Sequence, residues 1–171
     1  MPEGLQTRRT LVRDAAAADL DALRALAGDP RVADPYFGYW ARRDNLPDHY
    51  FLPQLGAAAV PERQLVAIRR ADGVLVGAVR LSQQYLGYFF APDVWRSGYA
   101  SEVLAALCPR LLAETGLPFL SIHVARENLA SIRLAERLGC SYHGLIWVPS
   151  ERLGHATFMD FRYSASISAA V

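Results

Sequence analysis

Two spacings of apolar residues divide the chain into predicted strands and helices. Short apolar runs bounded by turn residues predict strands at 8–13, 63–70, 74–82, 85–91, 118–125, 141–150 and 155–164. Apolar residues spaced by three and four predict helices at 14–28, at 128–139 and over a stretch that ends at Glu114. The order βα(α)βββαβαββ predicts one mixed sheet with helices on both faces, an α/β (α+β) fold.

Residues that begin and end helices set the expected helix limits. Asp14 is suited to cap the first helix, and Gly28 to end it in a left-handed conformation. Gly116 and Gly139 are expected to end the other two helices in the same way. Pro109 lies inside the second helix, where its missing N–H should kink or divide the helix.

Prolines and aromatic residues gather between the first helix and the second strand. We expect short helices and loops over 34–62. The aromatic part, 34–53, has two interpretations. It forms a mobile wall in which Tyr36, Tyr39 and Trp40 clasp an acceptor, or it packs on the sheet.

Length and hydrophobic content fit one domain. The chain has 171 residues, of which 52% are hydrophobic, as expected for a globular core. No repeat or internal boundary divides residues 1–171. We expect an ordered core over about 7–163 and a frayed tail at 164–171.

Every basic residue in the chain is an arginine. Eighteen arginines and no lysine exclude a lysine Schiff base, a lysine nucleophile and the phosphate-binding lysine of a GxxxxGK[ST] loop. Seventeen acidic residues leave a formal net charge of +1, so no bulk field draws nucleic acid or an anionic membrane to the chain. Any phosphate site must therefore be local.

Cysteine spacing and hydropathy narrow the expected setting. Cys108 and Cys140 form no CxxC pair and have no metal-ligand spacing with the four histidines, so no metal site is expected. We interpret both as reduced core residues, with a reactive thiol as the alternative. Because no window reaches the ~18 apolar residues of a membrane span, we expect a soluble, cytoplasmic protein.

The segment from Phe89 to Glu102 runs from a predicted strand through a loop into a predicted helix. Backbone N–H groups at a helix start are unsatisfied and carry partial positive charge. Gly98 permits a positive φ, and the small Ala100 lets a ligand lie close to the helix. The segment predicts an anion site suited to a pyrophosphate, with a plain strand-to-helix turn as the alternative.

Asn128 lies in a second loop that leads into a predicted helix, and it too is suited both to a structural role and to ligand binding. Its side chain is placed to cap the third helix by accepting from the N–H of Ser131. If the strands that end at Ala91 and Ala125 lie side by side, the anion loop and this helix flank one cleft. Parallel strands that splay there would offer unpaired backbone groups to an extended, amide-bearing ligand.

Three motifs in this order resemble the GNAT superfamily of acetyl-CoA-dependent N-acetyltransferases, and within it the RimJ/RimL-like branch that acetylates protein N-termini. They are GYFFAP at 87–92, WRSGYASE at 95–102, and NLAS at 128–131 followed by ERLG at 136–139. The resemblance covers roughly residues 7–163. It implies a mostly antiparallel sheet with a splayed central parallel pair, acetyl-CoA as co-substrate, an amine acceptor such as a protein N-terminus, and a monomer or homodimer.

The resemblance also implies which residues hold acetyl-CoA. Backbone groups of Phe89, Phe90 and Ala91 would bind the pantetheine. Asn128 and Ser131 would contact its arm near the sulfur. The amides that would cradle the pyrophosphate belong to Arg96, Ser97, Gly98, Tyr99 and Ala100.

Three features depart from the family pattern. Arg96 stands where many relatives have glycine, so the loop is stiffer or the guanidinium itself grips phosphate. Ala135 stands where many members carry a tyrosine acid. The connection between 74–82 and 85–91 is shorter than the branch usually shows, which affects the acceptor side.

The reaction that the resemblance implies is direct attack of a neutral amine on the thioester. A backbone N–H near a bulge in the Tyr88–Ala91 strand would stabilise the oxyanion. Deprotonation at pH 7 costs about 1–1.4 kcal/mol for an α-amine of pKa ~7.7–8.0, against roughly 4.6 kcal/mol for a lysine at ~10.4. A site without a strong base therefore favours α-amines.

Few residues are candidates for proton transfer. His123 is placed to relay a proton through water, with a satisfied core histidine as the alternative. Glu102 is a second candidate base, although at a helix start it more simply complements the dipole. Ser131 is the candidate proton donor to the leaving thiolate. The other histidines, His49, His143 and His155, have no partner pattern.

Two further functions stay open from the sequence. One is acetylation of a small-molecule amine, such as an antibiotic or polyamine. The other is a catalytically silent acyl-CoA-binding module, suggested by Ala135. A Rossmann dinucleotide enzyme is disfavoured because no GxGxxG follows an early strand.

Overall fold

A computed structural model describes residues 4–37, 51–52, 62–150 and 154–164 of the chain. The strands are β1 Leu5–Gln6, β2 Thr10–Asp14, β3 Glu62–Arg69, β4 Leu75–Ser82, β5 Tyr85–Phe90, β6 Leu120–Ala125, β7 Ser141–Ser150 and β8 Gly154–Tyr163. The helices are α1 Leu20–Gly28, α2 Pro30–Phe37, α4 Tyr99–Thr115 and α5 Leu129–Arg137, with short 3-10 turns η1 Ala17–Asp19 and η3 Pro92–Val94.

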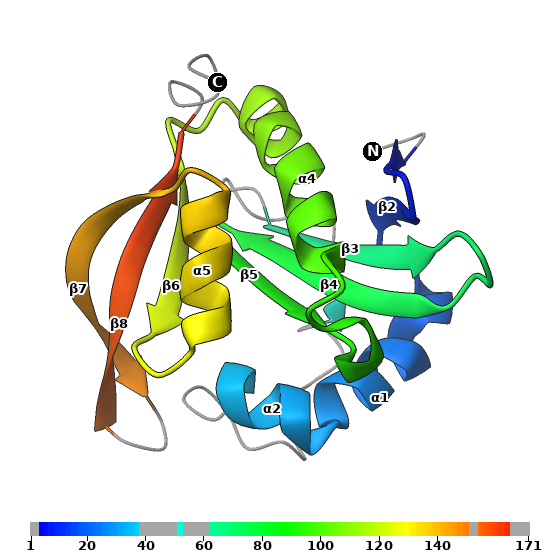
Figure 1. Cartoon of the computed structure of the whole chain (residues 1–171), viewed down its shortest axis with the longest axis horizontal. Helices are drawn as coiled ribbons and strands as arrows, with labels where there is room; N and C mark the ends of the chain where they lie inside the picture. The colour runs from blue at the N-terminus through cyan, green and yellow to red at the C-terminus, as the bar shows by residue number, and fades with distance from the viewer. Residues whose placement is uncertain (1–3, 38–50, 53–61, 151–153, 165–171) are drawn as a thin grey trace.

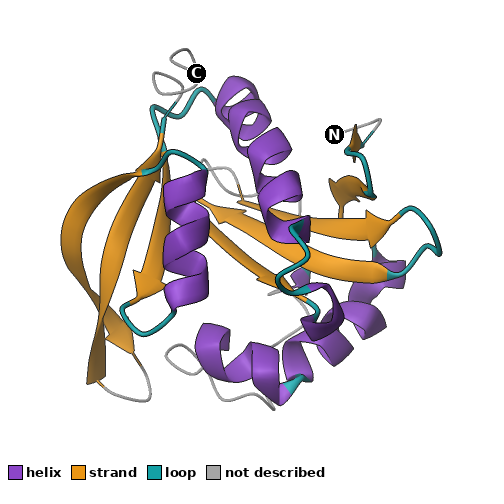
Figure 2. Cartoon of the chain, viewed as in Figure 1, coloured by secondary structure: helices purple, strands orange, loops and turns teal. Residues whose placement is uncertain are grey.

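The strands form an eight-stranded sheet in the order β1-β2-β3-β4-β5-β6-β8-β7. Neighbouring strands are antiparallel except for the central pair of β5 and β6, which is parallel. The predicted mixed, mostly antiparallel sheet with one parallel pair is therefore confirmed. Figure 2 shows how helices and loops surround this sheet.

Alternating side chains of the strands build a separate core on each face of the sheet. On β3, Leu65 and Ala67 belong to the core under α4 and α5, whereas Val66 between them joins the core under α1 and α2. Figure 1 shows α4 and α5 lying across one face. On that face Leu104 and Leu107 of α4 are fully buried, and each contributes roughly 1.5–3 kcal/mol of burial free energy. Helices on both faces are thus confirmed.

The central strands β5 and β6 touch at their starts and then separate. Tyr85 and Ser121 form their one register pair, and the N–H of Ser121 donates to the carbonyl of Gln84 at 2.8 Å. Beyond this point the two strands diverge (Figures 1 and 2). β6 instead continues its ladder with β8, from Leu120 opposite Tyr163 to Ala125 opposite Phe158.

The first helix begins and ends differently from the prediction. Asp14 does not cap it: it is the last residue of β2, and its carboxylate pairs with Arg63 at 2.8 Å. Asp19 accepts from the N–H of Ala16 at 2.8 Å instead, at the start of the η1 turn. Gly28 remains helical with no positive φ, and α2 follows at once. The strand pairing of Asp14 overrides its capping propensity.

The other helix limits agree better with the sequence. Gly116 and Gly139 follow α4 and α5 with φ of 68° and 77°, and Asn128 caps α5 by accepting from the N–H of Ser131 at 3.1 Å. Pro109 does not divide α4, which runs unbroken through it. The short strand β1 was not predicted, and most of 34–62 lies outside the described residues.

Candidate active site

A cavity of about 730 Å³ lies where β5 and β6 diverge. Residues from both faces of the sheet line it. Tyr88, Asn128 and Ser131 line it on the face of α4 and α5. On the opposite face the lining includes Tyr85, Ser121, His123, Asp160 and Arg162. One ligand could therefore approach from each face and meet the other inside the sheet.

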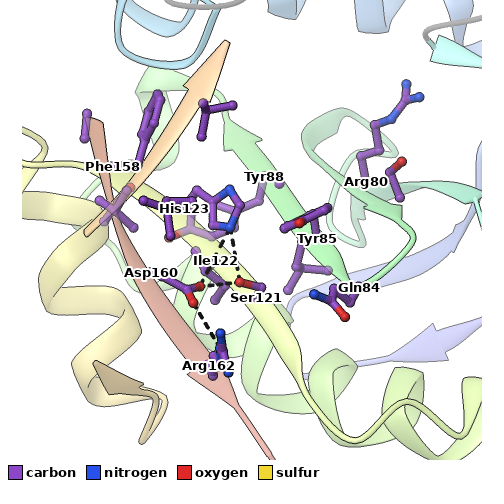
Figure 3. A pocket seen from close by; sticks show the side chains of 18 of the residues that line it. Arg80, Gln84, Tyr85, Tyr88, Ser121, Ile122, His123, Phe158, Asp160 and Arg162 are labelled. Atoms are coloured by element: carbon purple, nitrogen blue, oxygen red, sulfur yellow. Dashed lines mark hydrogen bonds and ion pairs between the residues drawn. The ribbon is translucent and has the colours of Figure 1, made fainter. Parts of the chain in front are cut away.

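Four polar side chains of the opposite face form a hydrogen-bonded group (Figure 3). Register brings them together, because His123 lies opposite Asp160 and Ser121 lies opposite Arg162 across β6 and β8. Asp160 accepts from the Ser121 hydroxyl through Oδ1 and from Nε of Arg162 through Oδ2, the latter at 2.9 Å. Both oxygens of this buried carboxylate are thus engaged.

His123 joins the group through one ring nitrogen. Its Nε2 lies 3.2 Å from the Ser121 Oγ and 3.7 Å from Asp160 Oδ1. Because the single hydroxyl hydrogen of Ser121 goes to Asp160, we infer that Nε2 is the donor in this contact and that Nδ1 carries the free lone pair. The ring of Tyr85 lies against the imidazole, with centroids 4.6 Å apart.

The surroundings keep His123 neutral at neutral pH. Burial lowers its pKa below the ordinary value near 6.5, and the charge of Arg162 lowers it further, while Asp160 opposes the shift. A neutral imidazole can accept a proton. The structure thus places the predicted candidate His123 in the cavity wall rather than in the closed core.

On the helix face, Ser131 occupies the first turn of α5. Its backbone N–H is held by Asn128, whose side chain also reaches the cavity wall. The hydroxyl of Tyr88 is buried nearby, and burial raises its pKa to about 12. Asn128 and Ser131, both predicted to contact pantetheine, are therefore brought together on one side of the gap.

The predicted anion loop has the backbone conformation of an anion nest. Arg96 and Gly98 both have left-handed φ angles, of 58° and 82°, with Ser97 between them. No side chain caps α4, so the N–H groups of Tyr99 and Ala100 in its first turn have no helical partner. Arg96, Ser97 and Gly98 are exposed. This loop lies outside the cavity lining, next to the start of α4.

An arginine that the sequence analysis did not select supports this loop. Nη1 of Arg9 donates to the carbonyl of Ser97 at 2.8 Å, and its guanidinium lies 4.0 Å from the ring centroid of Tyr99. A salt bridge of 2.7 Å joins it to Glu102. The turn between β1 and β2 thus braces the start of α4.

Glu102, a candidate base in the sequence, has a structural position. It accepts from the hydroxyl of Thr7 and from the backbone N–H and Nε of Arg9, each at 2.7 Å. Burial opposes ionisation, but these hydrogen bonds hold its pKa below the usual value. Since it does not line the described cavity, a role as catalytic base is not supported.

The backbone of β5 alternates between its two neighbours. The N–H of Ala91 donates to the carbonyl of Val76 at 2.8 Å, toward β4. By strand alternation the backbone of Phe89 also faces β4, whereas Tyr88 and Phe90 face the gap. Of the three residues predicted to bind pantetheine through the backbone, Phe90 is thus the one that faces it.

The expected bulge in β5 is absent. β4 and β5 pair in continuous register from Gly77 opposite Phe90 to Ser82 opposite Tyr85. The register shift of this region lies between Ala67 and Ile68, where β3 meets β4. The carbonyl of Phe90 accepts from the indole N–H of Trp95 at 2.7 Å. The end of β5 is therefore held by a side chain that follows the η3 turn.

The remaining candidates lie apart from the cavity. Cys108 is buried and Cys140 half-buried, both as free thiols, and burial raises the pKa of Cys140 to about 11. His143 is exposed on β7, 2.9 Å from Ser141. The side chains of His49 and His155 lie outside the described residues.

Two features are absent from the described ranges. These ranges contain no group of three His, Cys, Asp or Glu side chains arranged to hold a metal ion. No helix within them is long and apolar enough to cross a membrane.

Several site residues were missed by sequence reasoning. Ser121 and His123 are two positions apart in sequence, and so are Asp160 and Arg162. This spacing places each pair on one face of its strand, and it is the pattern in the sequence that could have indicated them. Their meeting depends on which strand of the terminal hairpin pairs with β6, and no local pattern reports that.

Known proteins provide an independent comparison. A family model described as an acetyltransferase (GNAT) domain matches residues 9–141. The chain is 27% identical over 152 residues to the uncharacterized N-acetyltransferase YoaA of Bacillus subtilis, covering 83% of this chain and 85% of that one.

Solved structures share the fold. The chain is similar to spermidine N-acetyltransferase from Vibrio cholerae in complex with CoA and spermine, with TM-score 0.75, 18% identity and coverage of 94% of this chain and 98% of that one. It is also similar to ribosomal-protein-S5-alanine acetyltransferase from Vibrio fischeri, with TM-score 0.72, 11% identity and coverage of 94% and 96%. Two proteins that share this fold are thus named for different acceptors, a polyamine and a ribosomal protein.

Proposed function

Because the chain belongs to the GNAT family of acetyltransferases, we propose that it acetylates the α-amine of a peptide or protein N-terminus, as the RimJ/RimL-like branch does. The family makes it an N-acetyltransferase with acetyl-CoA as co-substrate. The observation that carries the proposal is the cavity through the sheet, with His123 on one face and Ser131 on the other.

The helix face fits acetyl-CoA. The uncapped start of α4 and the nest from Arg96 to Gly98 suit a pyrophosphate, because both present unsatisfied N–H groups. The backbone groups of Tyr88 and the N–H of Phe90, which face the gap, suit the amides of an extended pantetheine, whereas the carbonyl of Phe90 already accepts from Trp95. Asn128 and Ser131 stand at the inner end of this path. Bound this way, acetyl-CoA supplies an activated acetyl group inside the sheet.

The opposite face fits the amine. His123 accepts one proton from the attacking amine through Nδ1, directly or through a water, while Nε2 stays bonded to Ser121. Asp160 and Arg162 hold this arrangement from β8. In the transfer a C–N bond forms and the thioester C–S bond breaks. The amine loses one proton to His123, and the thiolate leaves with the electron pair.

The strength of the base favours an α-amine. A histidine with a lowered pKa is a weak base, and it suits an amine that costs about 1–1.4 kcal/mol to deprotonate at pH 7 better than one that costs roughly 4.6 kcal/mol. The charge of the wall supports the same choice. Asp160 is the one carboxylate in the described lining, and both its oxygens are engaged. The described wall therefore offers no free carboxylate to the second ammonium of a polyamine.

The proposal is tested by acceptor preference. Purified protein is given acetyl-CoA with peptides that begin with Ala, Ser or Met, with matched N-blocked peptides, and with spermidine, and CoA release is followed. We expect release with free peptides and none with blocked ones. Faster turnover of spermidine would support the small-molecule alternative. Thermal stabilisation by acetyl-CoA without release for any amine would leave a binding module.

A further inference from the structure

A buried tyrosine hydroxyl stands beside the helix wall of the cavity. Within the described ranges, the hydroxyl of Tyr88 is the one buried side-chain polar atom without a hydrogen-bond partner. Such a group costs free energy in a folded protein, so it calls for an explanation. The ring packs against the core under α4 and α5 and lines the cavity, with the hydroxyl itself shut away from solvent.

Ser131 lines the same cavity as Tyr88, and its side chain lies near this hydroxyl. It is close enough to oppose the effect of burial on the pKa of Tyr88, yet the two hydroxyls do not meet the geometry of a hydrogen bond. Ser131 is half-buried and lines the cavity, and its backbone N–H is fixed by Asn128 at 3.1 Å. The backbone of Ser131 is thus held in the cavity wall by the side chain of Asn128.

The direction of hydrogen bonding between the two hydroxyls follows from their surroundings. The phenol keeps its proton at neutral pH, because burial raises its pKa to about 12. With its oxygen shut off from the cavity, the phenol can act on a ligand only through a neighbour. If it donates to Ser131 Oγ, the serine hydrogen is turned away from Tyr88 and toward the cavity.

We propose that Tyr88 is a positioning residue: its hydroxyl donates to Ser131 Oγ and so aims the Ser131 hydroxyl at the thioester sulfur when acetyl-CoA is bound. Ser131 then donates a hydrogen bond to the sulfur as negative charge develops there. No bond to the protein is made or broken, and the thiolate takes its proton from solvent after it leaves. This inference rests on the proposed function for the cofactor side of the cavity.

Removal of the hydroxyl while the ring is kept isolates this role. In Tyr88→Phe we expect kcat to fall about tenfold, less than the ~10²–10³ measured for a direct donor to developing charge, because Tyr88 acts through Ser131. KM for acetyl-CoA should stay within about twofold of the wild type, since the hydroxyl does not touch the ligand. The melting temperature should not fall, because the hydroxyl has no partner to lose.

The experiment compares the steady-state kinetics of wild type, Tyr88→Phe, Ser131→Ala and the double variant. Tyr142→Phe serves as the control, because Tyr142 is exposed, its ring packs on Phe161, and it does not line the cavity. We expect a larger kcat loss in Ser131→Ala, which removes the direct donor, than in Tyr88→Phe, and no loss in the double variant beyond that of Ser131→Ala. Unchanged kcat in Tyr88→Phe, or losses that multiply in the double variant, would overturn the inference.

The wild type separates this inference from the proposed function. If it acetylates only amines other than α-amines, the proposed acceptor fails, and the same variants are compared with the accepted amine. If it releases CoA with no amine, both proposals fail.

Discussion

His123 and Asp160 lie opposite each other on β6 and β8, with Nε2 of the histidine 3.7 Å from Oδ1 of the carboxylate. The Ser121 hydroxyl bridges them, and Arg162 binds the other oxygen of Asp160. All four side chains stand on paired strands rather than on loops. The imidazole orientation is therefore set by the ladder, as a proton acceptor in a catalytic site requires.

Replacement of this histidine should separate catalysis from cofactor binding. His123→Gln keeps a polar side chain but removes the basic ring nitrogen, so we expect kcat/KM for the amine to fall about 10²-fold, at the low end for general-base catalysis. Affinity for acetyl-CoA, measured by calorimetric titration, should change little because the histidine lies on the opposite face. His143→Gln, exposed on β7, is the control. Equal activity of both variants would remove His123 from the mechanism.

The pKa of His123 also predicts how stability depends on pH. Its folded pKa lies below the ordinary value near 6.5, so the folded state binds fewer protons than the unfolded state. The group therefore contributes stability that is present above about pH 6.5 and is lost as pH falls toward the folded pKa. Melting temperatures from pH 8 to 5 should fall more steeply for the wild type than for His123→Gln. Parallel curves would contradict the assigned shift.

The two glycines at the ends of α4 allow a matched test of the anion loop. Gly98 and Gly116 have similar left-handed φ angles, of 82° and 68°. A Cβ added at Gly98 would lie 3.5 Å from Nη2 of Arg9, which is an ordinary contact distance. A Cβ added at Gly116 would have no neighbouring atom within 4 Å. Each Gly→Ala change should cost about 1 kcal/mol of unfolding free energy through φ strain. Calorimetry should show weaker binding of acetyl-CoA only in Gly98→Ala. Equal affinities would place the pyrophosphate elsewhere.

Asn128 should prove to have two separable roles. Asn128→Ala loses the cap of α5 and about 1 kcal/mol of unfolding free energy, whereas Asn128→Ser keeps a capping oxygen and most of that stability. Because both variants lack the amide beside the cavity, both should bind acetyl-CoA more weakly. Urea denaturation and calorimetric titration measure the two effects. Wild-type affinity in Asn128→Ser would leave the residue with capping alone.

Local patterns predicted the parts of the fold that depend on local energetics. The β3-β4-β5 meander, the terminal hairpin and the cap of α5 by Asn128 are each set by residues close in sequence. The prediction that Asp14 caps the first helix was wrong, because its carboxylate accepts a hydrogen bond from Arg63, which is 49 positions away in sequence. The capping preference of a residue type is a local property, so it does not include the energy of such a long-range ion pair.

The face of the cavity that we propose for the amine could be predicted only with long-range information. Asp160 belongs to no motif that we recognised in the sequence. It lies beside His123 because β8, rather than β7, pairs with β6. Either strand of the hairpin has a pattern that could have paired there. The Tyr88 hydroxyl was missed for a related reason, since its lack of a partner is a property of the packed core.

The most direct test of the proposed function asks which nitrogen is acetylated. A peptide with a free N-terminal alanine and one internal lysine is incubated with the protein and acetyl-CoA at pH 7, and fragment-ion mass spectrometry locates the acetyl group. The chain has no lysine of its own to compete as an acceptor. The proposed function predicts acetylation of the α-amine, because the ε-amine costs roughly 3 kcal/mol more to deprotonate. Acetylation mainly on the lysine, or on neither amine, would contradict it.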